Sequence, residues 1–153
     1  MSGSSKTTSR PGPYRALVTT QQNTSRIAVV PVLVYADIEA AHDFLIRTFG
    51  FTSGGLQRDD SGTVVHGEVR FGEAPVWLHA VAPDHQMASP RACSQSHGGL
   101  EIAVEDVDVH HAHSEAAGAD IEYPPADKPY GLREYGARDP ENHRWWFCTP
   151  LAG

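Results

Sequence analysis

The chain has 153 residues, of which 40% are hydrophobic and 20% are charged, and its formal net charge is −7. This length and composition indicate one globular domain with enough mass to bury a core. No apolar run approaches the ~20 residues of a membrane-spanning helix, and the two cysteines lack a metal-binding spacing. We therefore expect a cytoplasmic protein with no secretion signal and no membrane contact.

The charge is unevenly distributed along the chain. Residues 1–26 carry a charge of +4, whereas residues 27–153 carry −11. The basic segment is rich in Ser and Thr and has no apolar periodicity, so we expect a disordered head. The acidic remainder argues against nucleic acid as a partner and favours neutral or cationic ligands.

The first half of the remaining sequence predicts one helix among four strands. A helix is expected over residues 38–49, with Asp37 as its N-cap and Gly50 after its last turn. Apolar runs and alternation predict the strands 27–35, 51–58, 63–71 and 75–82. The polar segment 83–98 has no apolar period, and it is either a plain connection or a mobile lid.

The same pattern then restarts. A second helix is expected over residues 107–117, with Asp106 as its N-cap and Gly118 after it. Strands are expected at 99–104, 119–123, 132–138 and 144–149, and residues 124–129 read as a loop. The two cap residues lie 69 positions apart, and a Gly follows them after 13 and 12 residues respectively. This repetition predicts two βαβββ modules, 27–82 and 99–149, within one α+β domain over 27–153.

The last two strands are joined by a turn with a specific composition. Its sequence is Asp139-Pro140-Glu141-Asn142-His143, in which Pro140 fixes φ and Asn142 tolerates a left-handed conformation. Together with the two repeats, the ending REYGARDPENHRWWF resembles the vicinal-oxygen-chelate superfamily of glyoxalases, bleomycin-resistance proteins and extradiol dioxygenases. The ending is close to the R-x-[YF]-x-x-x-DPxGH pattern of the bleomycin-resistance-like branch, with Asn142 in place of the usual Gly.

The resemblance implies an architecture and a set of metal positions. Tandem βαβββ modules would form a cupped mixed sheet with helices on the outer face, and the cup would hold the ligand. Two copies of the chain would form a dimer. The positions that match the metal ligands of the superfamily's metalloenzymes are occupied by Val30, Gly99, Trp146 and His79. Val, Gly and Trp cannot ligate, and one His cannot hold a catalytic ion that needs about three protein ligands. We therefore expect a protein without a metal or another cofactor.

Strand alternation selects the residues that would face the ligand. These candidates combine indoles, imidazoles and carboxylates, which suit a flat aromatic or cationic organic ligand. They are His66, Glu68, Trp77, His79, Glu101 and Trp146, with Tyr130 and Arg133 at the rim. Trp residues can instead be plain core, and Arg133 can instead pair with an acidic neighbour; a shift of one residue would exchange pocket and core. The second helix carries His110, His111 and His113, and it is expected to expose at least two of them on a solvated face.

The resemblance thus implies a small-molecule-binding protein that sequesters an antibiotic or an aromatic or cationic natural product, as a homodimer. One alternative is a metal-free enzyme acting on an aromatic small molecule, with His66 or His79 as general base beside Glu68 or Glu101. The other alternative is a metal-dependent lyase or dioxygenase of the same superfamily.

Overall fold

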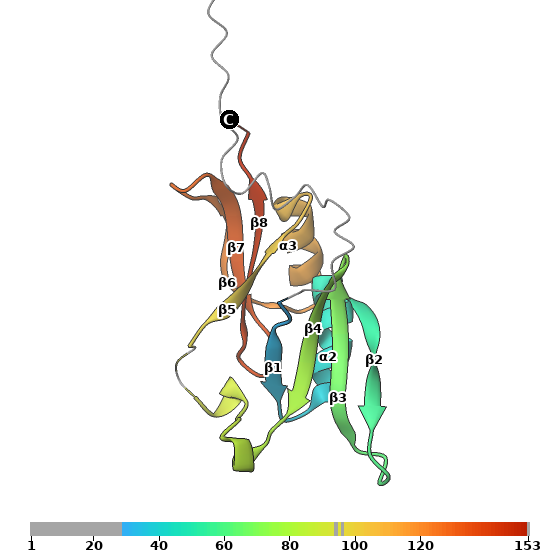
Figure 1. Ribbon diagram of the computed structural model, residues 1–153. Helices are drawn as coiled ribbons and strands as arrows, with labels where there is room; N and C mark the ends of the chain where they lie inside the picture. The colour runs from blue at the N-terminus through green and yellow to red at the C-terminus, as the bar shows by residue number, and fades with distance from the viewer. Residues whose placement is uncertain (1–28, 94, 96, 153) are drawn as a thin grey trace, which may run out of the picture.

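The computed structural model describes residues 29–93, 95 and 97–152, so the expected head lies outside the described residues. The first module consists of β1 (Val32–Tyr35), α2 (Ile38–Phe49), β2 (Thr52–Arg58), β3 (Val64–Phe71) and β4 (Ala74–Ala80). The second module consists of β5 (Gly99–Ala103), α3 (Val107–Ala116), β6 (Asp120–Asp127), β7 (Leu132–Arg138) and β8 (Arg144–Pro150). The predicted α+β class with two tandem βαβββ modules is confirmed (Figure 1).

The strands hydrogen-bond in two separate sheets of four. Their orders are β1-β4-β3-β2 and β5-β8-β7-β6. In each sheet the first strand of the module lies at an edge and runs parallel to the last strand, while the other neighbours are antiparallel. Within the described part of the chain, no helix is long and apolar enough to cross a membrane.

Both helices begin at the aspartates that the sequence indicated. The side chain of Asp37 accepts a hydrogen bond from the Ala40 N–H at 3.0 Å, and Asp106 accepts from two N–H groups of the first turn of α3. A cap of this kind satisfies donors that have no partner inside the helix. Gly50 ends α2 with a φ of 74°, a left-handed conformation that favours glycine.

One hydrophobic core serves both modules. Phe49, at the end of α2, contacts the rings of Trp145 and Phe147 on β8, with centroids 5.9 and 5.0 Å away. The hydroxyl of Ser114 on α3 donates to the carbonyl oxygen of Thr48 at 3.0 Å. The two helices therefore pack against each other, and the inner faces of the two sheets bury their apolar residues in a common core.

The packing of α3 against α2 and β8 contradicts the expectation that the histidines of α3 form a solvent-exposed face. His113 is exposed, but His110 and His111 are half-buried, and the ring of His110 packs on Phe147 with centroids 4.3 Å apart. Its Nε2 donates to the carbonyl oxygen of Phe49 at 3.0 Å, and burial lowers the pKa of His110. The sequence could not indicate this role, because the partners lie on α2 and β8.

One other expectation needs correction. The loop predicted for residues 124–129 is largely strand, because β6 continues through Pro124 and Pro125 to Asp127. Strand β6 lies at the edge of its sheet and shifts register between Tyr123 and Ala126, and edges and bulges tolerate proline. The linker contains two short 3₁₀ helices, Pro83–His85 and Pro90–Ala92.

The turn between β7 and β8 ties the second module to the first. Glu141 accepts hydrogen bonds from the backbone N–H groups of Ala36 and Asp37 at 2.7 and 2.8 Å, just before α2. Asn142 adopts a φ of 72°, as the turn chemistry predicted. This short segment therefore helps to position the modules relative to each other.

Candidate ligand-binding faces

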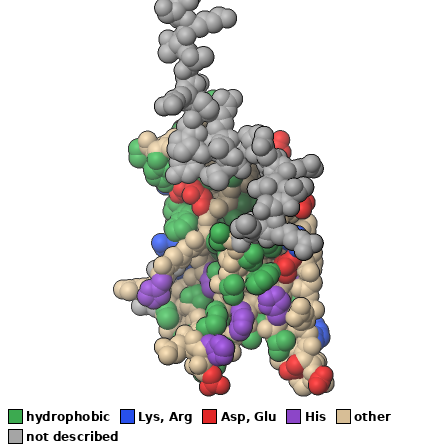
Figure 2. Space-filling view, in the orientation of Figure 1, with side chains coloured by type: hydrophobic (Ala, Val, Ile, Leu, Met, Phe, Trp, Pro, Cys, Tyr) green, Lys and Arg blue, Asp and Glu red, His purple; other side chains and the backbone are tan. Residues whose placement is uncertain are grey.

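The first sheet has a face that is turned away from the core, which we call the first open face. Val76 and Leu78 of β4 are buried, whereas the alternating Trp77 is 40% exposed. Cross-strand pairing and alternation define the first open face as Val32, Val34, His66, Glu68, Arg70, Trp77 and His79. Figure 2 shows hydrophobic and histidine side chains gathered over this sheet. The alternation in the sequence thus separated core from open face correctly.

Glu68 and Trp77 lie side by side on neighbouring strands. Oε2 of Glu68 accepts a hydrogen bond from the indole Nε1 of Trp77 at 2.9 Å, and Oε1 accepts from Nε of Arg70 at 2.7 Å. The hydrogen bond from Trp77 is the largest cause of the lowered pKa of Glu68. A Cβ at Gly54 of β2 would lie 2.6 Å from Cγ of Glu68, so the glycine leaves room for this carboxylate. Both carboxylate oxygens of Glu68 therefore accept hydrogen bonds from neighbouring side chains, Arg70 and Trp77.

The two histidines of this face are cross-strand partners, His66 on β3 and His79 on β4. Nδ1 of His79 lies 2.6 Å from the carbonyl oxygen of Ala80. A carbonyl can only accept, so Nδ1 carries the proton and Nε2 of the neutral ring has an unshared electron pair. The ring of His66 lies edge-on to Trp77, with centroids 5.7 Å apart and an interplanar angle of 76°.

The second sheet has an open face of its own, which carries Glu101, Glu134, Trp146 and Cys148. Glu134 is buried and accepts hydrogen bonds from the hydroxyls of Tyr123 and Tyr130. Burial, followed by the contact with Glu101, raises the pKa of Cys148 to about 12. Sequence reasoning missed Glu134, although its alternation with the buried Tyr135 is a signal that it lies on this face.

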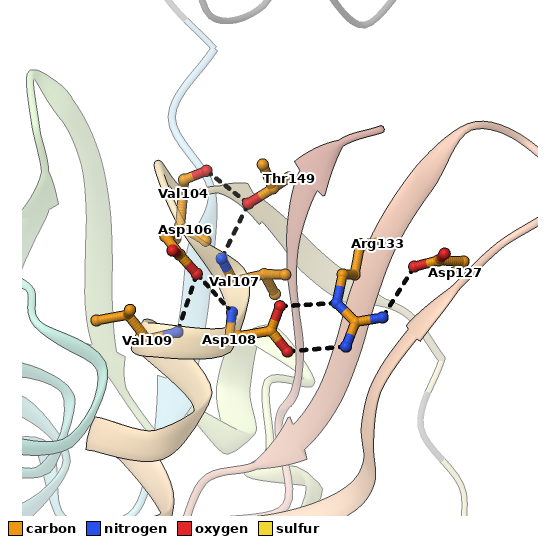
Figure 3. Close-up of polar contacts among 8 residues, drawn as sticks. All are labelled: Val104, Asp106, Val107, Asp108, Val109, Asp127, Arg133 and Thr149. Carbon is orange, nitrogen blue, oxygen red and sulfur yellow. Dashed lines mark hydrogen bonds and ion pairs between the residues drawn. The ribbon is translucent and has the colours of Figure 1, made fainter. Parts of the chain in front are cut away.

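Arg133 lies apart from the other candidates. Its guanidinium donates to both carboxylate oxygens of Asp108 on α3, at 2.7 and 2.8 Å, and to Asp127 on β6 at 2.8 Å (Figure 3). In this arrangement Arg133 joins β7 to the first turn of α3. This is the role of structural partner that the sequence left open.

The structure therefore brings the candidates together in two groups. His66, Glu68, Trp77 and His79 belong to the first open face, and Glu101, Tyr130 and Trp146 belong to the second. A cavity of about 360 Å³ lies between the edge strands β1 and β5, and the linker contributes to its wall. Its lining includes Val32, Val34, Ala88, Pro90, His97 and Leu100.

Comparison with known proteins places this architecture in a family. The model of the Glyoxalase/Bleomycin resistance protein/Dioxygenase superfamily matches residues 26–147. The chain belongs to this superfamily. The resemblance seen in the sequence is thereby confirmed.

Individual relatives cover most of the chain. The crystal structure of TioX from Micromonospora sp. ML1 is 37% identical, with a TM-score of 0.63, and the match covers 80% of this chain and 97% of TioX. TnmS3 from Streptomyces sp. CB03234, described as an antibiotic binding protein, is 24% identical with a TM-score of 0.61, covering 82% and 98% of the two chains. An uncharacterized protein of Mycobacterium bovis, Mb0911c, is 28% identical over 129 residues, covering 81% of this chain and 84% of its own.

The residues of this chain do not fit the metal site of the superfamily's metalloenzymes. A Cβ at Gly99 would lie 2.6 Å from the carbonyl oxygen of Arg144 and 2.8 Å from Cζ3 of Trp146. The Trp146 ring therefore fills the space that a ligating side chain at Gly99 would need, and an indole offers no lone pair to a metal. Among the described residues, no three His, Cys, Asp or Glu side chains are grouped closely enough to hold an ion.

Proposed function

We propose that this protein binds a small organic molecule without a metal ion and sequesters it, the ligand being an antibiotic or another aromatic natural product. The observation that carries the proposal is the exposed indole of Trp77, which Glu68 holds in place on the first open face beside Val32. A fixed, accessible aromatic ring offers a large stacking surface at little cost in side-chain entropy. We assign ligand contact to Trp77, His66 and His79, with Glu68 as the residue that positions Trp77.

The second open face supports the same function with more polar groups. Trp146 supplies another indole, and the guanidinium carbon of Arg144 lies 5.8 Å from its ring centroid. Glu101 and Tyr130 are the polar side chains that we assign to ligand contact there. TnmS3 is described as an antibiotic binding protein, but at 24% identity this likeness shows the fold alone. The proposal therefore rests on the side chains of this chain.

We extend the proposal to a homodimer in the cytoplasm. Val32 is 44% exposed and its cross-strand partner Trp77 is 40% exposed, and Val81, just after β4, is also 40% exposed. A monomer seldom leaves such apolar side chains uncovered together, so a second copy would cover part of this surface around the ligand. Cys93 and Cys148 are free thiols, which suits a reducing compartment. Light scattering coupled to size-exclusion chromatography tests the dimer, and a monomer mass at micromolar concentration would reject it.

A tryptophan-fluorescence titration against a panel of aromatic and cationic antibiotics tests the function. Saturable binding, weakened in Trp77→Phe and followed by recovery of unchanged ligand, is the expected result. The unshared electron pair on Nε2 of His79 favours one rival, a metal-free enzyme with this imidazole as general base. Formation of a new product, lost in His79→Phe, would support that rival. If no compound of the panel binds in this titration, the proposed function is rejected.

A further inference from the structure

We propose that the first open face selects a flat, uncharged aromatic ligand that carries a hydroxyl group, and that it does not select a cation. This inference rests on the proposed function and narrows the class of its ligand. In this arrangement Trp77 stacks on the ring system and Nε2 of His79 accepts a hydrogen bond from the ligand hydroxyl. The cationic ligands that the sequence also suggested are thereby excluded from this face.

The hydroxyl requirement follows from the hydrogen bond that His79 makes with the backbone. Its Nδ1 donates to the Ala80 carbonyl oxygen at 2.6 Å, which leaves Nε2 of the neutral ring as a pure acceptor. Among the described residues, Nε2 of His79 has no hydrogen-bond partner. The His79 side chain belongs to the first open face, so a ligand bound there can reach this nitrogen. A buried or ligand-covered acceptor needs a donor, so a ligand that supplies an O–H is favoured over one that does not.

The exclusion of cations follows from the partners of Glu68. Alternation places this carboxylate on the first open face, but Arg70 neutralises its charge at 2.6 Å and the indole of Trp77 holds its second oxygen. A ligand cation that approached the carboxylate would also meet the positive charge of Arg70, which opposes its binding. Glu68 is therefore a positioning residue, which fixes the orientation of the Trp77 ring.

The spacing along β4 sets the size of the ligand. Trp77 and His79 lie two residues apart on the same face, which is a separation of ~7 Å along a strand. A fused system of two or three rings, stacked on Trp77 with its hydroxyl on the outer ring, covers this distance. A single ring stacked on the indole falls short of Nε2.

The test uses three probes that share one ring system: 2-naphthol, 2-methoxynaphthalene and 2-naphthyltrimethylammonium. Their dissociation constants are measured on the full chain at pH 8 by NMR, from the shift of the Trp77 indole N–H signal. We expect 2-naphthol to bind about five-fold more tightly than its methyl ether, which is the worth of one hydrogen bond. The ammonium probe should bind no more tightly than the ether.

Two variants test whether His79 causes the preference for the hydroxyl and whether Glu68 only positions Trp77. His79→Phe should reduce the ratio of naphthol to ether affinity to about one while leaving the ether affinity nearly unchanged, and His85→Phe, an exposed linker histidine, is the matched control. Glu68→Ala should weaken all three probes by similar factors, since it releases the Trp77 ring, and should keep the hydroxyl preference.

Three outcomes would overturn the inference. The first is tightest binding of the ammonium probe with loss of that advantage in Glu68→Gln, which would make Glu68 a cation site. The second is an equal affinity for naphthol and ether in the unmodified chain. The third is a failure of all three probes to bind while members of the antibiotic panel do bind. Each of these three outcomes rejects the inference about the ligand class but leaves the proposed small-molecule binding intact. If neither the probes nor the antibiotics bind, the proposed function itself is rejected.

Discussion

Tyr35 donates its hydroxyl proton to the carboxylate of Asp139 at 2.6 Å, and the two residues are 104 positions apart in the sequence. Both side chains are buried, and the same carboxylate oxygen accepts from the indole Nε1 of Trp145 at 3.1 Å. Burial, reinforced by the charge of Asp139, raises the pKa of Tyr35 well above its ordinary value. The hydroxyl therefore remains a donor, and it links the end of β1 to the turn after β7.

Tyr35→Phe should lower the free energy of unfolding by about 1–3 kcal/mol, because it leaves a buried carboxylate with one donor fewer. Urea denaturation followed by circular dichroism measures the change. Tyr130→Phe is the comparison variant: it also removes one donor from a buried carboxylate, that of Glu134, but Tyr130 is itself 52% exposed, so its loss should cost less. A stability of Tyr35→Phe equal to that of the unmodified chain would show that the contact between Tyr35 and Asp139 adds nothing to the stability of the fold.

Glu141 should make the fold sensitive to acid. Burial raises its pKa, but the donors Ala36 N–H, Ser89 hydroxyl and Asp37 N–H outweigh burial, so the folded-state pKa lies below the ordinary value. Such a carboxylate stabilises the fold fully above its unfolded pKa of ~4.3 and loses this effect as pH falls through the lower folded value. Stability should therefore decline below pH ~5.

Glu141→Gln should show a shallower acid decline than the unmodified chain, together with a lower stability at neutral pH. Chemical denaturation at a series of pH values from about 3 to 7 measures both effects. Glu73→Gln, at an exposed glutamate in the turn before β4, serves as the control and should keep the original slope. Parallel curves for the unmodified chain and Glu141→Gln would contradict the assignment.

Gly99→Ala should destabilise the second module by about 1–3 kcal/mol, because the new methyl group meets a backbone oxygen and the Trp146 ring. The change in Trp146 environment should also shift the fluorescence emission. Gly98→Ala is a close control, since a Cβ there meets nothing within 4 Å. Thermal unfolding compares the two variants, and an unchanged melting temperature in Gly99→Ala would mean that this contact relaxes easily.

The two cysteines should react at very different rates. Cys93 is exposed, whereas Cys148 is buried and its pKa is raised to about 12. The reactive thiolate is therefore scarce at Cys148 at pH 8. A colorimetric thiol assay should count one fast thiol in the native protein and a second one after addition of guanidinium chloride. Two fast thiols would indicate that the second open face admits the reagent and exposes Cys148.

Local patterns predicted many elements of this fold because their causes lie within a few residues. Helix α2 runs over Ile38–Phe49 as expected, since Asp37 and Gly50 mark its two ends. Strand alternation places Trp145 and Phe147 on the face opposite the candidate Trp146, and both are fully buried. Strand β6 was partly missed, because two prolines indicate a loop unless the strand lies at an edge, and edge position is a property of the sheet.

The candidate site could be predicted only in part, for a related reason. Alternation placed His66, Trp77 and His79 on one face, but it could not say which donors surround Glu68 or that Arg133 reaches Asp108 on α3. Those contacts depend on the register between strands and on how helices lie against the sheets. The sequence therefore suggested a carboxylate at Glu68 that is available to a ligand, whereas in the folded chain Arg70 and Trp77 donate hydrogen bonds to it.

The amino-acid sequence by itself determined the two modules, their capped helices and the side of each strand that is buried, because these follow from neighbouring residues and from their spacing. The tertiary structure decided which polar groups remain available to a ligand. Glu68 is held by Arg70 and Trp77, and Glu134 is held by Tyr123 and Tyr130, while Nε2 of His79 keeps its electron pair. The physical reason is that a hydrogen bond depends on distance and direction in space, which strand register and packing set.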